Sequence, residues 1–189
     1  YKIRDPKVFR DFLMSNITDI DLKNCNIAEC TKLAVDIVTS HLKIVGNSTS
    51  AFDELEADKI PIDKLIMEGC ESGCACRHFA AATTTVFEEL QKLAKQSGNN
   101  SLDGYVMFEN DMPEFSHASV AIAHGDSVTI IDPSWYANDK KQGSNAKLDY
   151  TFGAGRGNLT SLFRTLSKAP KGYPQYRIFN MGSVDAMTK

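Results

Sequence analysis

The chain has 189 residues, of which 42% are hydrophobic and 9% aromatic, so it can bury a sizeable core and lacks the composition of a disordered protein. Twenty-one basic residues, scattered among 24 acidic ones, leave a net charge near −3, which argues against nucleic acid as a partner. No apolar run approaches the roughly 20 residues of a membrane-spanning helix, and the charged start, residues 1–5, is not a signal peptide.

The first part of the chain predicts helices. Asp5-Pro6 precedes apolar residues spaced along one helical face, which predicts a short capped helix. Residues 28–45 carry the same spacing over a longer stretch, and Gly46 ends the pattern. The polar stretch 47–50 is too short to separate two domains, and a short helix is expected over 62–68.

A loop of small residues, 69–75, leads into the clearest helix of the chain. From Phe79 to Leu93 apolar residues recur every three or four positions, so we expect a core-facing helix that ends near Lys95. Cys76 opens this helix. Because the unpaired N–H groups and the dipole of a helix N-terminus stabilise an anion, the position lowers a thiol pKa from about 8.5.

Three strands are expected next, at 105–108, 118–123 and 128–131, with a hairpin turn at 124–126. A two-residue turn at His124-Gly125 would set His117 directly opposite Asp132, within reach of a hydrogen bond. A three-residue turn would place these two side chains on opposite faces, so a shared catalytic role predicts a turn of even length or a compensating bulge. Beyond residue 136 the chain is polar and rich in glycine, before a helix expected near 159–166 and a closing strand near 176–179.

Cys76, His117 and Asp132 supply the three groups of a nucleophilic cysteine site. Each alone has a simpler interpretation: Cys76 as a small buried residue, His117 as a structural histidine, and Asp132 as a turn former before Pro133. Their order along the chain and the short hairpin between the last two favour a shared catalytic role. His78 follows Cys76 by two helical positions and is expected to point away from it, as a structural or surface residue. His41 and His124 are interpreted as a helix-face residue and a turn residue.

These residues resemble the core of the transglutaminase-like superfamily. The resemblance spans residues 69–136 and rests on Gly73 and Cys76 with Ala80 four positions on, on His117-Ala118, and on Asp132-Pro133. It implies an α+β, papain-like fold in which the cysteine helix packs against an antiparallel sheet that carries the histidine and the aspartate. The chain is accordingly expected to form one domain, 1–189, with a helical part at 1–68, the catalytic core at 69–136 and a C-terminal part at 137–189.

The resemblance implies chemistry through a thioester, shared by crosslinkers, deamidases, peptidases, peptide N-glycanases and arylamine N-acetyltransferases. The Arg-Gly-Gly run of the acetyltransferases is missing, and no acidic loop has calcium-ligand spacing. The small size favours hydrolysis or deamidation of an amide in a protein or peptide substrate, without a cofactor, and protein crosslinking is the alternative. Cys76 would attack, His117 would transfer the proton, and Asp132 would orient His117. The backbone N–H of Cys76 and a donor from Cys74 or Ala75 would hold the oxyanion. Trp135 would shield the His117–Asp132 pair, form a wall of the substrate cleft, or lie in the core.

Other interpretations of the same residues stay open. Cys70, Cys74, Cys76 and His78 could ligate zinc, although their spacing is not that of paired zinc knuckles, and the fold could serve as an inactive binding module. The five cysteines suit two disulfides and one thiol in an oxidising compartment, or five thiols in the cytosol. Sequons at Asn16, Asn47, Asn99 and Asn158 lean toward secretion but do not decide localisation. Substrate specificity would come from loops 46–60, 109–116 and 137–157, and the oligomeric state stays open.

Overall fold

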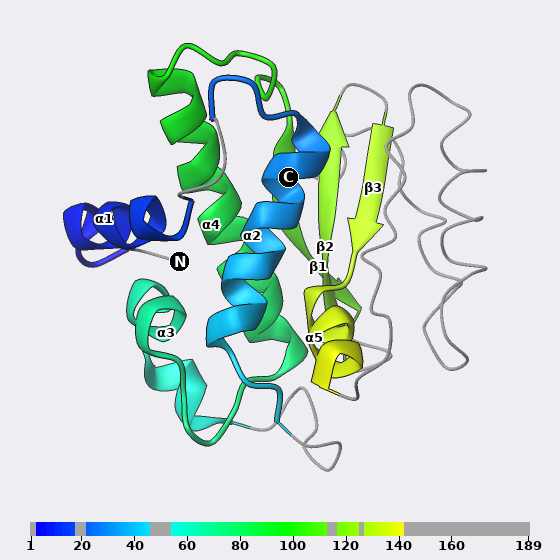
Figure 1. Cartoon of the computed structure of the whole chain (residues 1–189). Coiled ribbons are helices and arrows are strands. Elements are labelled where there is room, and N and C mark those ends of the chain that lie inside the picture. The colour runs from blue at the N-terminus through cyan, green and yellow to red at the C-terminus, as the bar shows by residue number, and fades with distance from the viewer. Residues whose placement is uncertain (1–2, 18–21, 46–53, 113–116, 125–126, 142–189) are drawn as a thin grey trace.

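The computed structural model describes residues 3–17, 22–45, 54–112, 117–124 and 127–141 (Figure 1). Its elements are α1 (Pro6–Asn16), α2 (Ile27–His41), the 3-10 helix η1 (Glu56–Lys59), α3 (Ile62–Glu68), α4 (Cys76–Gln96), β1 (Val106–Met112), β2 (His117–His124), β3 (Ser127–Ile131) and α5 (Pro133–Lys141). The expected α+β class is confirmed at this level. The connector at 47–50, the helix at 159–166 and the strand at 176–179 lie outside the described residues.

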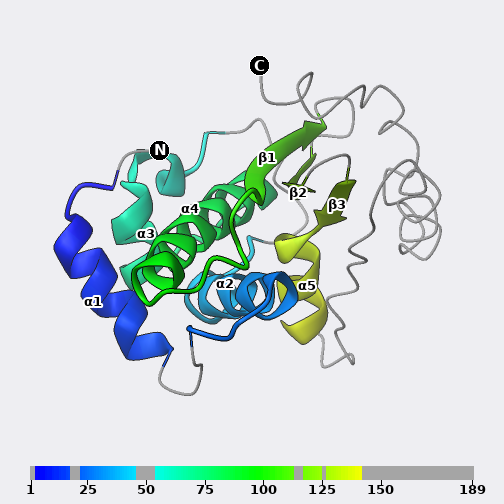
Figure 2. The ribbon, with the colours of Figure 1, turned by 90° about the horizontal axis from the view of Figure 1, so that it is seen from above.

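Helix α4 is the centre of the described structure (Figures 1 and 2). It packs along α2 and against β1 and β2, and it also contacts α1, α3 and α5. Phe79, Phe87 and Leu90 are fully buried on it, so the predicted apolar spacing does face the core. The helix starts at Cys76, as expected.

The sheet is antiparallel, with strand order β1-β2-β3. Val120 and Ile122 of β2 and Ile131 of β3 belong to the main core, and β2 contacts α4. The strand expected at 105–108 is longer than predicted, because Glu109–Met112 continue the pairing with β2. No helix in the described part of the chain is long and apolar enough to span a membrane.

The predicted helix 28–45 is too long. Helix α2 ends at His41, and Leu42 is already extended, with φ −91° and ψ 132°. The next residues pair with the loop before α4: Cys74 N–H donates to Lys43 O at 2.7 Å, and Val45 N–H donates to Cys74 O at 3.0 Å. This contact with a distant segment, which apolar spacing cannot reveal, ends the helix early.

The hairpin register differs from the one expected for a turn at His124-Gly125, although the predicted even length of the turn is confirmed. His124, expected in the turn, is the last residue of β2 and pairs with Ser127, and Val120 pairs with Ile131. Continued by one residue, this register sets Asp132 opposite Ser119 rather than His117. Two residues lie between the paired ends, so the number is even, and His117 and Asp132 stay diagonal neighbours on one face.

Candidate active site

Cys76 is held at the start of α4. Ala75 before it is the N-cap residue, with an extended backbone, and Cys76 is the first helical residue. Its side chain is half-buried, and its Sγ accepts a hydrogen bond of 3.3 Å from the N–H of Ala118 on β2. The contact joins the N-terminus of α4 to the start of β2, the strand that carries His117.

His117 and Asp132 meet at the ends of β2 and β3. The Nε2 atom of His117 lies 2.5 Å from Asp132 Oδ2, and the side chains are 18% and 8% exposed. A hydrogen bond also links His117 to Cys76. Since Nε2 is bound to Asp132, Nδ1 is the ring nitrogen that can exchange a proton with the thiol. The structure therefore brings together the three residues on which the catalytic prediction depends.

Asp132 is itself fixed by the start of α5. Its Oδ1 accepts hydrogen bonds from Ser134 Oγ at 2.7 Å and from Trp135 N–H at 2.9 Å. The carboxylate thus caps α5 with one oxygen and binds His117 with the other. Helix α5 was not predicted, although Asp followed by Pro is a recognised helix start. Trp135 is partly buried and supports the site through its backbone N–H.

The three groups shift one another's pKa values. Burial raises the pKa of the Cys76 thiol. The hydrogen bond and charge of His117 and the hydrogen bond from the N–H of Ala118 lower this pKa by more than burial raises it, so it lies below its ordinary value. Burial lowers the pKa of His117, but Asp132 and Cys76 outweigh burial and raise it to about 10. Despite its burial, the pKa of Asp132 is lowered by the hydrogen bond and charge of His117. These shifts favour a thiolate beside an imidazolium.

Two of the backbone donors expected at an oxyanion site are already used. The N–H of Cys74 donates to Lys43 O at 2.7 Å, and the N–H of Ala75 donates to His78 Nδ1 at 3.0 Å. The N–H of Cys76, at the first position of the helix, has no hydrogen-bond acceptor among the described residues. The geometry therefore leaves Cys76 as the backbone donor of this segment.

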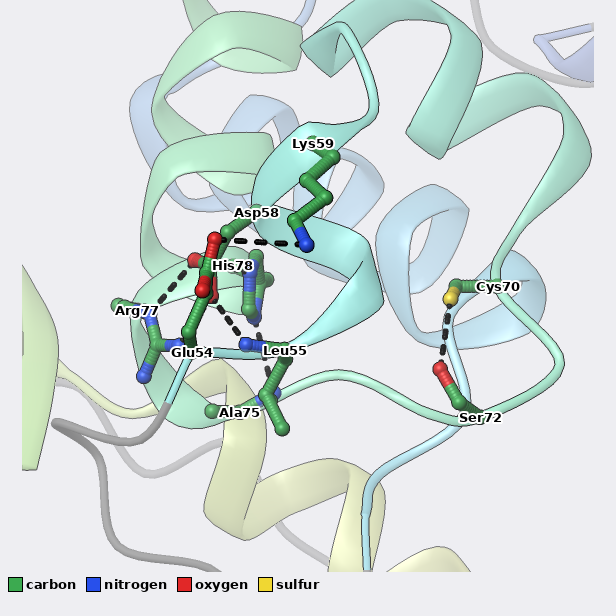
Figure 3. Close-up of polar contacts among 9 residues, drawn as sticks. All are labelled: Glu54, Leu55, Asp58, Lys59, Cys70, Ser72, Ala75, Arg77 and His78. Carbon is green, nitrogen blue, oxygen red and sulfur yellow. Dashed lines mark hydrogen bonds and ion pairs between the residues drawn. The ribbon is translucent and has the colours of Figure 1, made fainter.

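Asp58, which the sequence did not single out, contacts the first turn of α4 (Figure 3). It accepts two hydrogen bonds from Arg77, at 2.9 and 2.6 Å, and its Oδ1 lies 2.9 Å from Nε2 of His78. The Arg77 hydrogen bonds are the largest cause that holds the pKa of Asp58 well below its usual range. His78 is buried, and burial lowers its pKa. Of the two positions expected for His78, structural or surface, its burial excludes the surface. Twenty residues separate it from Asp58, and no short motif signals the pair.

The four cysteines other than Cys76 are buried, and all five are thiols in the structure. Burial raises the pKa of Cys74 to about 12, and Cys70 Sγ lies 3.1 Å from Ser72 Oγ. Both ring nitrogens of His78 are engaged within the chain, which removes it from the zinc set considered above. No group of three metal-ligating side chains occurs among the residues that the structure describes.

The side chain of Asn99, the residue of the third sequon, is buried and binds the backbone of the segment before α2. Asn99 is 6% exposed, and its side-chain amide donates to Leu22 O at 2.8 Å and Cys25 O at 2.9 Å. In the folded chain this nitrogen is not available to carry a glycan. Asn16 is exposed, whereas Asn47 and Asn158 lie outside the described residues.

Comparisons with models of protein families, with curated proteins and with solved structures returned no match to this chain.

Proposed function

We propose that the chain is a thiol-dependent acyl-transfer enzyme that hydrolyses or deamidates an amide, with a papain-like core of the transglutaminase-like superfamily. The observation that carries the proposal is the convergence of three side chains from three elements: Cys76 at the start of α4, His117 at the start of β2 and Asp132 at the cap of α5. The contact between the His117 ring and both partners supports a proton-transfer role.

The geometry supports a two-step reaction. The Cys76 thiolate attacks the amide carbonyl, and the N–H of Cys76 donates to the oxyanion. His117 gives its proton to the leaving nitrogen, the C–N bond breaks, and the amine, or ammonia in a deamidation, leaves a thioester on Cys76. Neutral His117 then takes a proton from water, the resulting hydroxide attacks the thioester, and the C–S bond breaks. The products are a carboxylic acid and the restored thiolate–imidazolium pair.

The proposed acyl acceptor is water rather than a lysine amine. The choice between hydrolysis and crosslinking is tested directly. A reactive enzyme should release acid from an amide substrate at the same rate with or without added primary amine. Incorporation of the amine in preference to water would replace hydrolysis by crosslinking.

The proposal is tested by the rate of iodoacetamide alkylation at each cysteine between pH 5 and 9, mapped by mass spectrometry. Cys76 should react fastest and well below pH 8. His117→Ala should slow Cys76 at pH 7 by about tenfold or more, because burial then raises the thiol pKa without an opposing imidazolium. His124→Ala, at the exposed far end of the same strand, is the matched control and should change nothing. A Cys76 that labels no faster than an ordinary thiol would overturn the proposal.

A further inference from the structure

The peptide unit between Cys74 and Ala75 is bonded on both edges. Its carbonyl, from Cys74, accepts from Val45 N–H at 3.0 Å. Its N–H, from Ala75, donates to His78 Nδ1 at 3.0 Å. Since a peptide unit is planar, these two bonds fix its orientation, and with it the backbone just before Cys76.

The next peptide unit carries the N–H of Cys76. Its carbonyl, from Ala75, accepts from His78 N–H at 3.0 Å and therefore points along α4. In a trans peptide the N–H points opposite to the carbonyl, so the N–H of Cys76 points out of the helix N-terminus. Its direction depends on the dihedral angles of Ala75, which the bond to His78 Nδ1 constrains.

His78 is held in turn by Asp58. Because Nδ1 accepts a hydrogen bond from Ala75, the ring proton of neutral His78 lies on Nε2 and is donated to Asp58 Oδ1 at 2.9 Å. Asp58 is fixed by the two bonds from Arg77 and by the N–H of Leu55, at 2.7 Å (Figure 3). The result is a second His–Asp pair, which binds the backbone one residue before the nucleophile.

We infer that Asp58 and His78 form a positioning pair that aims the N–H of Cys76 at the oxyanion of the reacting carbonyl. This inference rests on the proposed function. His78 touches neither the thiol nor the carbonyl and acts through the backbone of Ala75. It follows that His78 matters for reactions that form an oxyanion at this site and much less for reactions that only need the thiolate.

Two reagents distinguish reactions that form an oxyanion from reactions that need only the thiolate. Alkylation of Cys76 by iodoacetamide displaces iodide at a saturated carbon and forms no oxyanion. Acetylation by p-nitrophenyl acetate does form one: the thiolate attacks the carbonyl, p-nitrophenolate leaves, and an acetyl thioester remains on Cys76 until water hydrolyses it. The first-turnover release of p-nitrophenolate, with the acetyl group located by mass spectrometry of rapidly quenched samples, gives the acetylation rate, and mass spectrometry gives the alkylation rate at the same sulfur.

In His78→Leu, which removes the acceptor for Ala75 N–H, the acetylation rate should fall about 100-fold, the effect of losing one oxyanion donor, while alkylation changes less than about threefold. His78→Gln should restore most of the acetylation rate, since a glutamine at the third helical position can accept the same N–H. His41→Leu makes the same substitution at the end of α2 and is the matched control, with neither rate changed.

Asp58→Asn gives a second, milder test should the leucine variant not fold. It keeps His78 but loses the charge that anchors the ring, and acetylation should fall by about tenfold with alkylation unchanged. Equal changes in the two rates, or no change in either, in the variant that folds would overturn the inference. A wild-type Cys76 that is not acetylated at all would instead overturn the proposed function.

Discussion

At the scale of single residues, the Asp132 carboxylate is the group that keeps the proton on His117. It binds the imidazole directly, and the start of α5 holds it in that position. In Asp132→Asn the charge is lost, and only one of the two oxygens that accept hydrogen bonds from His117 and from the start of α5 remains. The pKa of His117 should then fall from about 10 by about one to three units. An NMR titration of the His117 ring measures the shift directly.

The control for this prediction is Asp103→Asn. Asp103 forms an exposed ion pair with Lys95 at the opposite end of α4, so its loss should leave the His117 titration unchanged. A His117 pKa near 10 in Asp132→Asn would mean that Cys76 alone holds the proton on the ring.

The Cys76–His117 pair also predicts how stability depends on pH. Cys76, whose folded pKa is lowered, adds stability above its unfolded value of about 8.5, and this is lost as pH falls through the folded value. His117, raised to about 10, adds stability below about 6.5 that is lost as pH rises through 10. Between the folded pKa of Cys76 (or about 6.5, if that is higher) and about 8.5 each state holds one proton on the pair, so its contribution is flat.

Above pH 8.5 the unfolded pair holds no proton while folded His117 still does, so stability should fall by at most about 2 kcal/mol up to pH 10. The fall due to this pair is the difference between the urea-unfolding profiles of wild type and of the double variant Cys76→Ala/His117→Ala from pH 7 to 10.5. The double variant removes both titrating groups and keeps the fall that the buried thiols Cys30 and Cys74, whose pKa values burial raises, add to both proteins. Parallel profiles for wild type and variant would show that His117 is not charged in the folded protein.

At the scale of elements, the site depends on the contact between the segment after α2 and the loop before α4. Gly73 lies in this contact with φ +92°, and a Cβ there would lie 3.0 Å from Cα of Val45. Gly98, after α4, has φ +86° but open space around it. Gly98→Ala should therefore cost about 1–2 kcal/mol from backbone strain alone. Gly73→Ala should cost about 1–3 kcal/mol more and should also slow the alkylation of Cys76.

Urea unfolding of the two variants gives both free energies. Equal losses would show that the contact with Val45 yields easily and does not support the site.

Local patterns in the sequence identified the elements better than their ends. The start of α4 at Cys76 could be predicted because apolar spacing and the preceding loop lie side by side in the chain. The end of α2 could not, because the apolar pattern continues through Val45 while the helix stops at His41. What stops it is pairing with Cys74, about thirty residues away, and such a contact leaves no mark in helical spacing.

The candidate site follows the same rule. The partners of Cys76 were found because His117 and Asp132 lie on one hairpin, whose even parity survived a shift of the turn by one residue. Asp58 was missed because it reaches α4 from η1, and nothing in the spacing of 58 and 78 distinguishes this pair from chance.

At the scale of the whole molecule, the core divides the five thiols into one accessible group and four that are shielded. Cys25, Cys30, Cys70 and Cys74 are each at most 9% exposed, and they pack in the main core around α4. Only Cys76 is more than marginally accessible. Reaction of the buried thiols therefore requires the structure to open, whereas Cys76 can react in the folded state.

A thiol reagent added to the native protein should accordingly modify one equivalent rapidly and four more at least about 10³-fold more slowly, since folded domains open with free energies of several kcal/mol. In denaturing urea all five should react together. Cys76→Ser should lose the rapid equivalent and keep the four slow ones, which identifies the rapid thiol. Fewer than five thiols in urea without reductant would show that some had paired as disulfides. A second rapid thiol in the native protein would show that the segment around it opens on its own, independently of the core that holds the site.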